Sequence, residues 1–224
     1  MMGFLRRLLG RGAADEDGGP GAGRRGGRGF DAALEIDRPT YAIGDVHGRF
    51  DCLERLLGRI GEDAAAAGFE APRLVMLGDY VDRGEQSAEV LSRLAGLLRN
   101  PGAAGFGEVA ALKGNHEAMM LEFLEEPERA GPRWLRNGGL QTMLSFGVGG
   151  VQLSSEGEAL VGAAERLAAA AAPVLETLRG LDLWRRHGNV LFVHAGGDPG
   201  TPPELQGESS LIWGTTRFFQ EART

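Results

Sequence analysis

Four short segments of this 224-residue sequence combine glycine with side chains that can bind metal ions or move protons. They read Gly44-Asp45-Val46-His47-Gly48, Gly78-Asp79-Tyr80-Val81-Asp82-Arg83-Gly84, Gly114-Asn115-His116-Glu117 and His194-Ala195-Gly196. Six of their side chains offer a carboxylate, amide or imidazole group: Asp45, His47, Asp79, Asn115, His116 and His194. This mixture suits manganese, iron or zinc and is too rich in nitrogen for calcium. Two such ions about 3.5–4 Å apart would stabilise both the attacking and the leaving oxygen of an in-line displacement.

The second segment places Asp79, Asp82 and Arg83 directly after the apolar run 74–77. Charged groups at the end of a buried strand are costly unless they pair with each other or bind an ion. A single buried histidine is more often a structural hydrogen-bonding residue than a metal ligand. Here, however, all histidines of the chain except His187 lie in these segments. The recurrence favours one shared metal site over four unrelated structural roles.

The elements that must position these segments alternate between strand and helix. Apolar runs at 40–45, 74–79 and 108–112 predict three buried strands, and each leads into one of the segments. Apolar residues at helical spacing follow the first two strands, at 50–60 and 90–98. Alternating strands and helices predict a parallel sheet with ligand groups outside the carboxyl ends of its strands.

Residues 125–181 interrupt this alternation and are predicted to form a helical insertion beside the site. An alanine-rich helix is expected at 158–172, and the proline that follows is expected to start a second helix at 173–179. Segments 181–186 and 189–193 then predict a hairpin that leads into the last of the four segments.

Composition indicates a single globular domain at 37–224, preceded by a disordered tail at 1–36 that is rich in glycine and arginine. The formal net charge of −7 argues against a nucleic-acid-binding surface. No apolar run approaches the roughly 18–20 residues that would span a bilayer. Because the sequence has one cysteine, an internal disulfide is excluded, and a reducing, cytoplasmic location is expected. This residue, Cys52, is predicted to be a small core residue. The oligomeric state is not predicted.

The four segments, in this order over residues 40–197, resemble the motifs of the calcineurin-like metallophosphoesterases. The forms of 80–84 and 115–117 resemble the phosphoprotein phosphatase branch, in its bacterial serine/threonine type, and the stretch 134–147 is also similar to those proteins. The resemblance implies an α/β fold of the αββα sandwich type, with two mixed sheets flanked by helices. It also implies hydrolysis of phosphoserine and phosphothreonine in proteins by metal-activated water.

The resemblance assigns roles to the matching residues. Five of them would bind two divalent cations, expected to be manganese, with iron or zinc as alternatives: Asp45, His47, Asp79, Asn115 and His194. Asp79 would bridge the cations. His116 would protonate the leaving alkoxide and would be oriented by Asp82. Arg83 would bind the phosphate through two hydrogen bonds. Arg49 would be either a second phosphate contact or an arginine on a helix surface.

The sequence departs from the family pattern at its end. Relatives carry one more metal-ligating histidine downstream, but no histidine follows His194 here. We therefore expect either a chain that ends before the last strands or a protein that has lost this ligand. The missing histidine leaves open an alternative to the phosphoprotein phosphatase, a metal-poor binding module without catalysis. A second alternative, within the same two-metal chemistry, is a dinucleoside polyphosphate hydrolase.

Overall fold

The computed structural model describes residues 33–221, whose buried apolar side chains form a core cluster between the sheet and the helices. The chain divides into two units, residues 1–33 and 34–224, and all but one of the described residues belong to the second. The predicted tail, 1–36, lies outside the described residues except for its last four. That tail and the domain predicted at 37–224 therefore stay predictions. No helix within 33–221 is both long enough and apolar enough to cross a membrane.

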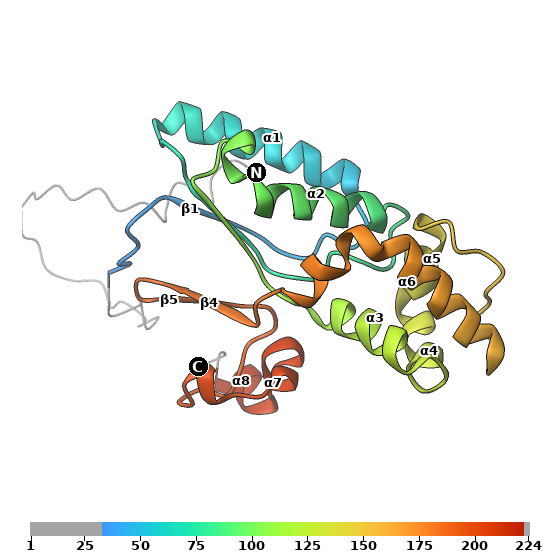
Figure 1. Cartoon of the computed structure of the whole chain (residues 1–224). Helices are drawn as coiled ribbons and strands as arrows, with labels where there is room; N and C mark the ends of the chain where they lie inside the picture. Colours follow the sequence, from blue (N-terminus) through green and yellow to red (C-terminus); the bar gives the residue numbers. More distant parts are fainter. Residues whose placement is uncertain (1–32, 222–224) are drawn as a thin grey trace, which may run out of the picture. The chain divides into compact units, whose positions relative to one another are not determined.

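Three parallel strands position most of the candidate site: β1 (Thr40–Ile43), β2 (Arg73–Met76) and β3 (Glu108–Ala111). They pair in the order β1-β2-β3, and every residue of the central strand is buried, as its continuous apolar run predicts. Helices α1 (Phe50–Ala67) and α2 (Ser87–Arg99) connect the strands and lie along one side of them (Figure 1). The predicted alternation of strand and helix is thus confirmed.

Two details differ from the sequence-based expectation. The first two strands end at Ile43 and Met76, before the acidic residues predicted to close them. After β2 the extended backbone cannot continue to Asp79, because Gly78 and Asp79 have positive φ angles of 105° and 55°. Cys52 is exposed rather than part of the core. The buried face of α1 begins with its neighbour Leu53, and successive helical residues point about 100° apart, so Cys52 faces solvent.

The region after β3 is helical, in agreement with the expectation for 125–181. Its elements are α3 (Asn115–Glu125), α4 (Pro127–Trp134), the π-helical turn η3 (Leu135–Gly139), α5 (Leu140–Ser145) and α6 (Glu158–Arg179). The predicted break at Pro173 is wrong, because α6 runs through this residue as one helix. Proline removes one backbone donor from a helix, but residues on both sides of it, Ala171 and Val174, are buried in the core, and this packing holds the helix together.

The predicted hairpin is formed by β4 (Trp184–His187) and β5 (Val190–Val193), which pair antiparallel. Just before it, Asp182 exchanges backbone hydrogen bonds with Ala111 and Lys113 at the end of β3, at 3.1 and 2.7 Å. Four short helical elements complete the described chain: η2 (Pro101–Ala104), η4 (Pro203–Leu205), α7 (Glu208–Trp213) and α8 (Thr216–Glu221).

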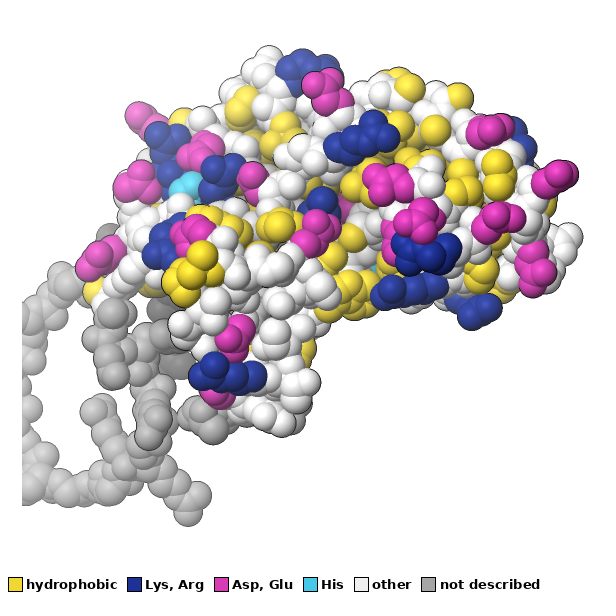
Figure 2. All heavy atoms as spheres, turned by 60° about the horizontal axis from the view of Figure 1, so that its bottom comes forward, with side chains coloured by type: hydrophobic (Ala, Val, Ile, Leu, Met, Phe, Trp, Pro, Cys, Tyr) yellow, Lys and Arg dark blue, Asp and Glu magenta, His cyan; other side chains and the backbone are white. Residues whose placement is uncertain are grey.

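The fold class is therefore α/β, with two sheets and flanking helices, as expected. In the described residues one sheet is wholly parallel and the other wholly antiparallel, whereas mixed sheets were expected. On the face shown in Figure 2, basic and acidic side chains are interspersed.

Candidate metal centre

The carboxyl ends of the strands bring the predicted ligands together around Asp79. Its Oδ2 lies 3.6 Å from His47 Nε2, and its Oδ1 lies 3.4 Å from His194 Nε2. Two groups of side chains each offer ligand atoms within 4.8 Å of one another: His47, Asp79 and His116, and Asp45, Asp79 and His194. Asp79 is the one residue that both groups share.

Backbone carbonyl groups fix the orientation of two histidines. The Nδ1 of His47 donates to the carbonyl oxygen of Val81 at 2.9 Å, and the Nδ1 of His194 donates to that of Leu77 at 2.8 Å. A carbonyl oxygen only accepts, so Nδ1 carries a hydrogen in both rings, and in the neutral imidazole Nε2 then has the free lone pair. Both Nε2 atoms face Asp79, which is the arrangement that a metal-ligating histidine needs.

Asn115 supplies a separate sign that these residues fit a cation. Its side-chain oxygen Oδ1 is buried and has no hydrogen-bond partner among the described residues. A buried amide oxygen without a partner is unfavourable, and a bound cation would satisfy it. The adjacent residue is tied to the cluster, because the backbone N–H of His116 donates to Asp79 Oδ1 at 3.1 Å. Carboxylate, imidazole and amide donors together suit manganese, iron or zinc.

A buried carboxylate holds His116 from the other side. His116 Nδ1 lies 2.7 Å from Asp82 Oδ2, and neither side chain is significantly exposed. Asp82 also accepts from Trp134 Nε1 at 2.9 Å and from Thr142 Oγ1 at 2.7 Å. Burial favours the neutral imidazole, but the hydrogen bond to Asp82 and the charge of Asp79 outweigh burial and raise the pKa of His116 above its ordinary value.

Arg83 reaches into the cluster between two imidazoles. One terminal nitrogen of its guanidinium donates to His47 Nε2 at 2.9 Å, and the other donates to His116 Nε2 at 3.1 Å. Its backbone N–H donates to the carbonyl oxygen of Gly138 at 3.3 Å. Because the lone pair of His47 is also the one that a cation would use, Arg83 and a cation compete for it.

Arg49 is the predicted site residue that the structure places elsewhere. Its guanidinium makes two hydrogen bonds with Asp51 on the first turn of α1, at 2.9 and 2.8 Å. A role in phosphate binding would require this arginine to leave Asp51, so that role stays a prediction.

The backbone of the site is held in conformations that side chains other than glycine seldom adopt. His47, Asp79, Asp82 and Arg83 have φ angles of 44°, 55°, 72° and 68°. Such residues each cost about 1–3 kcal/mol and persist only where their surroundings hold them. Gly114 shows how tight these surroundings are, because a Cβ atom there would collide with Asp79.

Sequence reasoning gave no role to two residues that organise this backbone. Glu117, on the first turn of α3, accepts hydrogen bonds from the backbone N–H groups of Asp79, Tyr80, Val81 and Gly114. A glutamate three residues after the helix-capping position is a recognised capping signal, but that signal predicts only the contact with Gly114. Thr142 accepts from the backbone N–H of Asp82 at 2.8 Å as well as donating to its side chain. Nothing in the sequence near Thr142 indicates this contact.

Burial also affects the charge of Glu117. Loss of solvent and the nearby carboxylate of Asp79 raise the pKa of Glu117 to about 7, although the backbone N–H groups oppose this shift.

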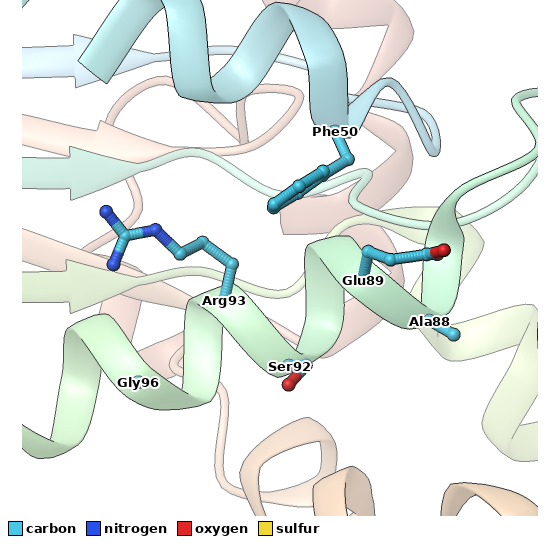
Figure 3. A pocket seen from close by; sticks show the side chains of 6 residues that line it. All are labelled: Phe50, Ala88, Glu89, Ser92, Arg93 and Gly96. Atoms are coloured by element: carbon cyan, nitrogen blue, oxygen red, sulfur yellow. The ribbon is translucent and has the colours of Figure 1, made fainter. Parts of the chain in front are cut away.

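A separate surface pocket of about 610 Å³ lies between α1 and α2 and contains none of the predicted site residues. Figure 3 shows the six residues that line it: Phe50, Ala88, Glu89, Ser92, Arg93 and Gly96. The residues suited to metal chemistry therefore lie at the strand ends and not in this pocket.

Comparison with known proteins agrees with this geometry. The family model of the calcineurin-like phosphoesterases matches residues 38–211. Serine/threonine-protein phosphatase 2 of Escherichia coli is 33% identical over 102 residues, which cover 46% of this chain and 39% of that protein. A protein phosphatase 2A catalytic chain of Dictyostelium discoideum is 39% identical over 89 residues, which cover 39% of this chain and 25% of that protein.

Among solved structures, a cold-active protein tyrosine phosphatase matches with a TM-score of 0.43 and 23% identity, covering 75% of this chain and 47% of that chain. The matched segments span between 8% and 39% of the length of the first curated relatives. The family model, however, covers most of the described chain, from the first parallel strand to α7. The chain belongs to the calcineurin-like phosphoesterase family.

Proposed function

We propose that this chain is a metal-dependent phosphomonoesterase that hydrolyses phosphoserine and phosphothreonine in proteins. The observation that carries the proposal is the pair of candidate ligand groups that share Asp79, beside the buried pair of His116 and Asp82. The motif forms at 80–84 and 115–117, which resemble those of phosphoprotein phosphatases, support the choice of substrate.

The proposal assigns two divalent cations, preferably manganese, to five residues: Asp45, His47, Asp79, Asn115 and His194. When bound, they would supply Lewis-acid stabilisation of the phosphoryl charge and would activate the attacking water. Asp79 would bridge them because its two oxygens already face different histidines.

The side chains of the chain itself would orient the substrate and move one proton. Arg83 presents two N–H groups on one planar guanidinium, which suits two oxygens of a phosphoryl group. Once Arg83 has turned from His116 Nε2 to the phosphoryl group, His116 would hold a proton on that Nε2 and give it to the leaving alkoxide oxygen. Asp82, on Nδ1 of the same ring, would keep the imidazole oriented and would stabilise its charged form.

The test compares two substitutions in the chain reconstituted with Mn²⁺ after EDTA treatment. Asp79→Asn should abolish turnover of p-nitrophenyl phosphate and reduce bound metal, because it removes the shared charge. His116→Ala should slow turnover by about 10²- to 10⁴-fold, the usual contribution of a general acid, and should leave metal content largely unchanged. Asp63→Asn on α1, outside the cluster, is the matched control.

Substrate class is measured with peptides that carry phosphoserine, phosphothreonine or phosphotyrosine, and with diadenosine tetraphosphate. Preference for the first two peptides supports the proposal. Preference for the dinucleotide would reassign the chain to dinucleoside polyphosphate hydrolysis. Absence of both metal binding and turnover would indicate a binding module, and full activity of Asp79→Asn would refute the bridging role.

A further inference from the structure

Glu117 is a fully buried carboxylate that gathers four backbone N–H groups beside the metal centre. Its Oε2 accepts from Asp79 at 2.8 Å and from Gly114 at 2.9 Å. Its Oε1 accepts from Tyr80 at 2.7 Å and from Val81 at 3.2 Å. Only the contact with Gly114 belongs to the capping of α3. The other three join α3 to the loop that follows β2.

These three contacts fix the part of the loop that directs Asp79. Asp79, Tyr80 and Val81 are consecutive, and one carboxylate binds all of their N–H groups. The same loop carries left-handed φ angles at Asp79 and, directly after Val81, at Asp82. Left-handed backbone is unfavourable for residues other than glycine. A set of hydrogen bonds to one carboxylate can offset this cost, because hydrogen bonds to a charged group are stronger than those between neutral groups.

In its ionised form Glu117 is stabilised by the backbone rather than by a cationic side chain. Within residues 33–221, no lysine, arginine or histidine forms an ion pair with it. The four N–H groups and the N-terminal end of the eleven-residue helix α3 stabilise it instead. A glutamine at this position would turn an NH₂ group toward two of these donors, and those hydrogen bonds would be lost.

We propose that Glu117 is a positioning residue for the metal centre. Its carboxylate holds the backbone at 79–81 so that the two oxygens of Asp79 face His47 and His194. Glu117 itself touches neither metal nor substrate in this role. The inference rests on the proposed function only for the presence of a metal site. It predicts that metal affinity depends on a side chain whose own oxygens point at the backbone.

The test measures the affinity of the metal-free chain for Mn²⁺ alone by titration calorimetry. Glu117→Gln should weaken the affinity by about 10- to 100-fold, as is usual when a residue that orients metal ligands is changed. Glu117→Asp keeps the charge on a shorter side chain and should recover part of the affinity. Glu125→Gln, an exposed residue at the end of the same helix, is the matched control and should bind Mn²⁺ as the wild type does.

Circular dichroism establishes folding for each variant, and the Mn²⁺ concentration for half-maximal turnover should rise by the same factor as the Kd. Wild-type affinity in folded Glu117→Gln would overturn the proposal, even with a lowered Tm. If that variant does not fold, the affinity of Glu117→Asp decides in the same way. If neither variant folds, hydrogen exchange of the backbone amides 79–81 is measured in the wild type. Exchange as fast as that of open loops would overturn the proposal, and protection of these amides would support it. A wild type that binds Mn²⁺ but hydrolyses no ester would overturn the proposed function alone.

Discussion

Thr142 offers a direct measure of how strongly the structure holds Asp82. Its hydroxyl donates to Asp82 Oδ1 at 2.7 Å and accepts from the Asp82 backbone N–H at 2.8 Å, in a fully buried position. Thr142→Val keeps the shape of the side chain but removes both hydrogen bonds. A hydrogen bond to a charged group contributes about 1.5–3 kcal/mol. Loss of the Thr142 hydroxyl as an acceptor for the Asp82 backbone N–H adds only about 0.5–1 kcal/mol to this cost. The reason is that Ser87 Oγ, at 3.2 Å, still accepts a hydrogen bond from that N–H.

The free energy of unfolding should therefore fall by about 2–4 kcal/mol. Urea unfolding followed by circular dichroism measures it, and the midpoint should move down by about 1–2 M for a slope near 2 kcal/mol per molar. Thr177→Val on α6, a threonine away from Asp82, is the matched control and should change the free energy by less than about 0.5 kcal/mol. A loss below about 1 kcal/mol in Thr142→Val would show that the carboxylate does not depend on this hydroxyl.

Two further predictions concern a partly buried ion pair and a tight turn. Burial opposes ionisation of Glu108, but the hydrogen bond and charge of Arg73 outweigh it and hold the pKa of Glu108 below its usual value of 4.5. The stabilisation by this pair should be complete above pH 4.5 and should be lost as the pH falls through the lower pKa of the folded state. The Tm of Arg73→Met should accordingly fall less steeply with acid than that of the wild type, and equal slopes would contradict this. Gly138 has a φ of 104°, and a Cβ atom there would lie 2.5 Å from the backbone nitrogen of Arg83. Gly138→Ala should raise KM for phosphate esters about tenfold, or roughly 1.4 kcal/mol, whereas Gly149→Ala, with open space around it, should leave KM unchanged.

The convergence of the candidate ligands could be predicted because it follows from one rule. Parallel strands end at the same edge of a sheet, so Asp45, Asp79 and Asn115 had to lie near one another once three such strands were recognised. The fourth segment was harder, since a hairpin does not fix where His194 lies. Its repeated glycine and histidine pattern and the resemblance to a family motif were the indications.

The contacts that hold the site could not be predicted for a different reason. Thr142 and Trp134 reach Asp82 across sequence separations of 60 and 52 residues, and both belong to a helical region whose path the sequence does not define. Local competition was also missed. Arg49 meets Asp51 only two residues away, so a short-range ion pair takes up the side chain that was expected at the phosphate.

The hydrogen bond between His194 and Leu77 joins residues 117 positions apart. A nascent chain that has reached the end of α6 already contains β1, β2, β3 and that long helix. It still lacks the imidazole that faces Asp79 from the hairpin side. During synthesis most of the core residues thus precede His194, and a growing polypeptide cannot place this imidazole beside Asp79 until most of the described sequence has left the ribosome.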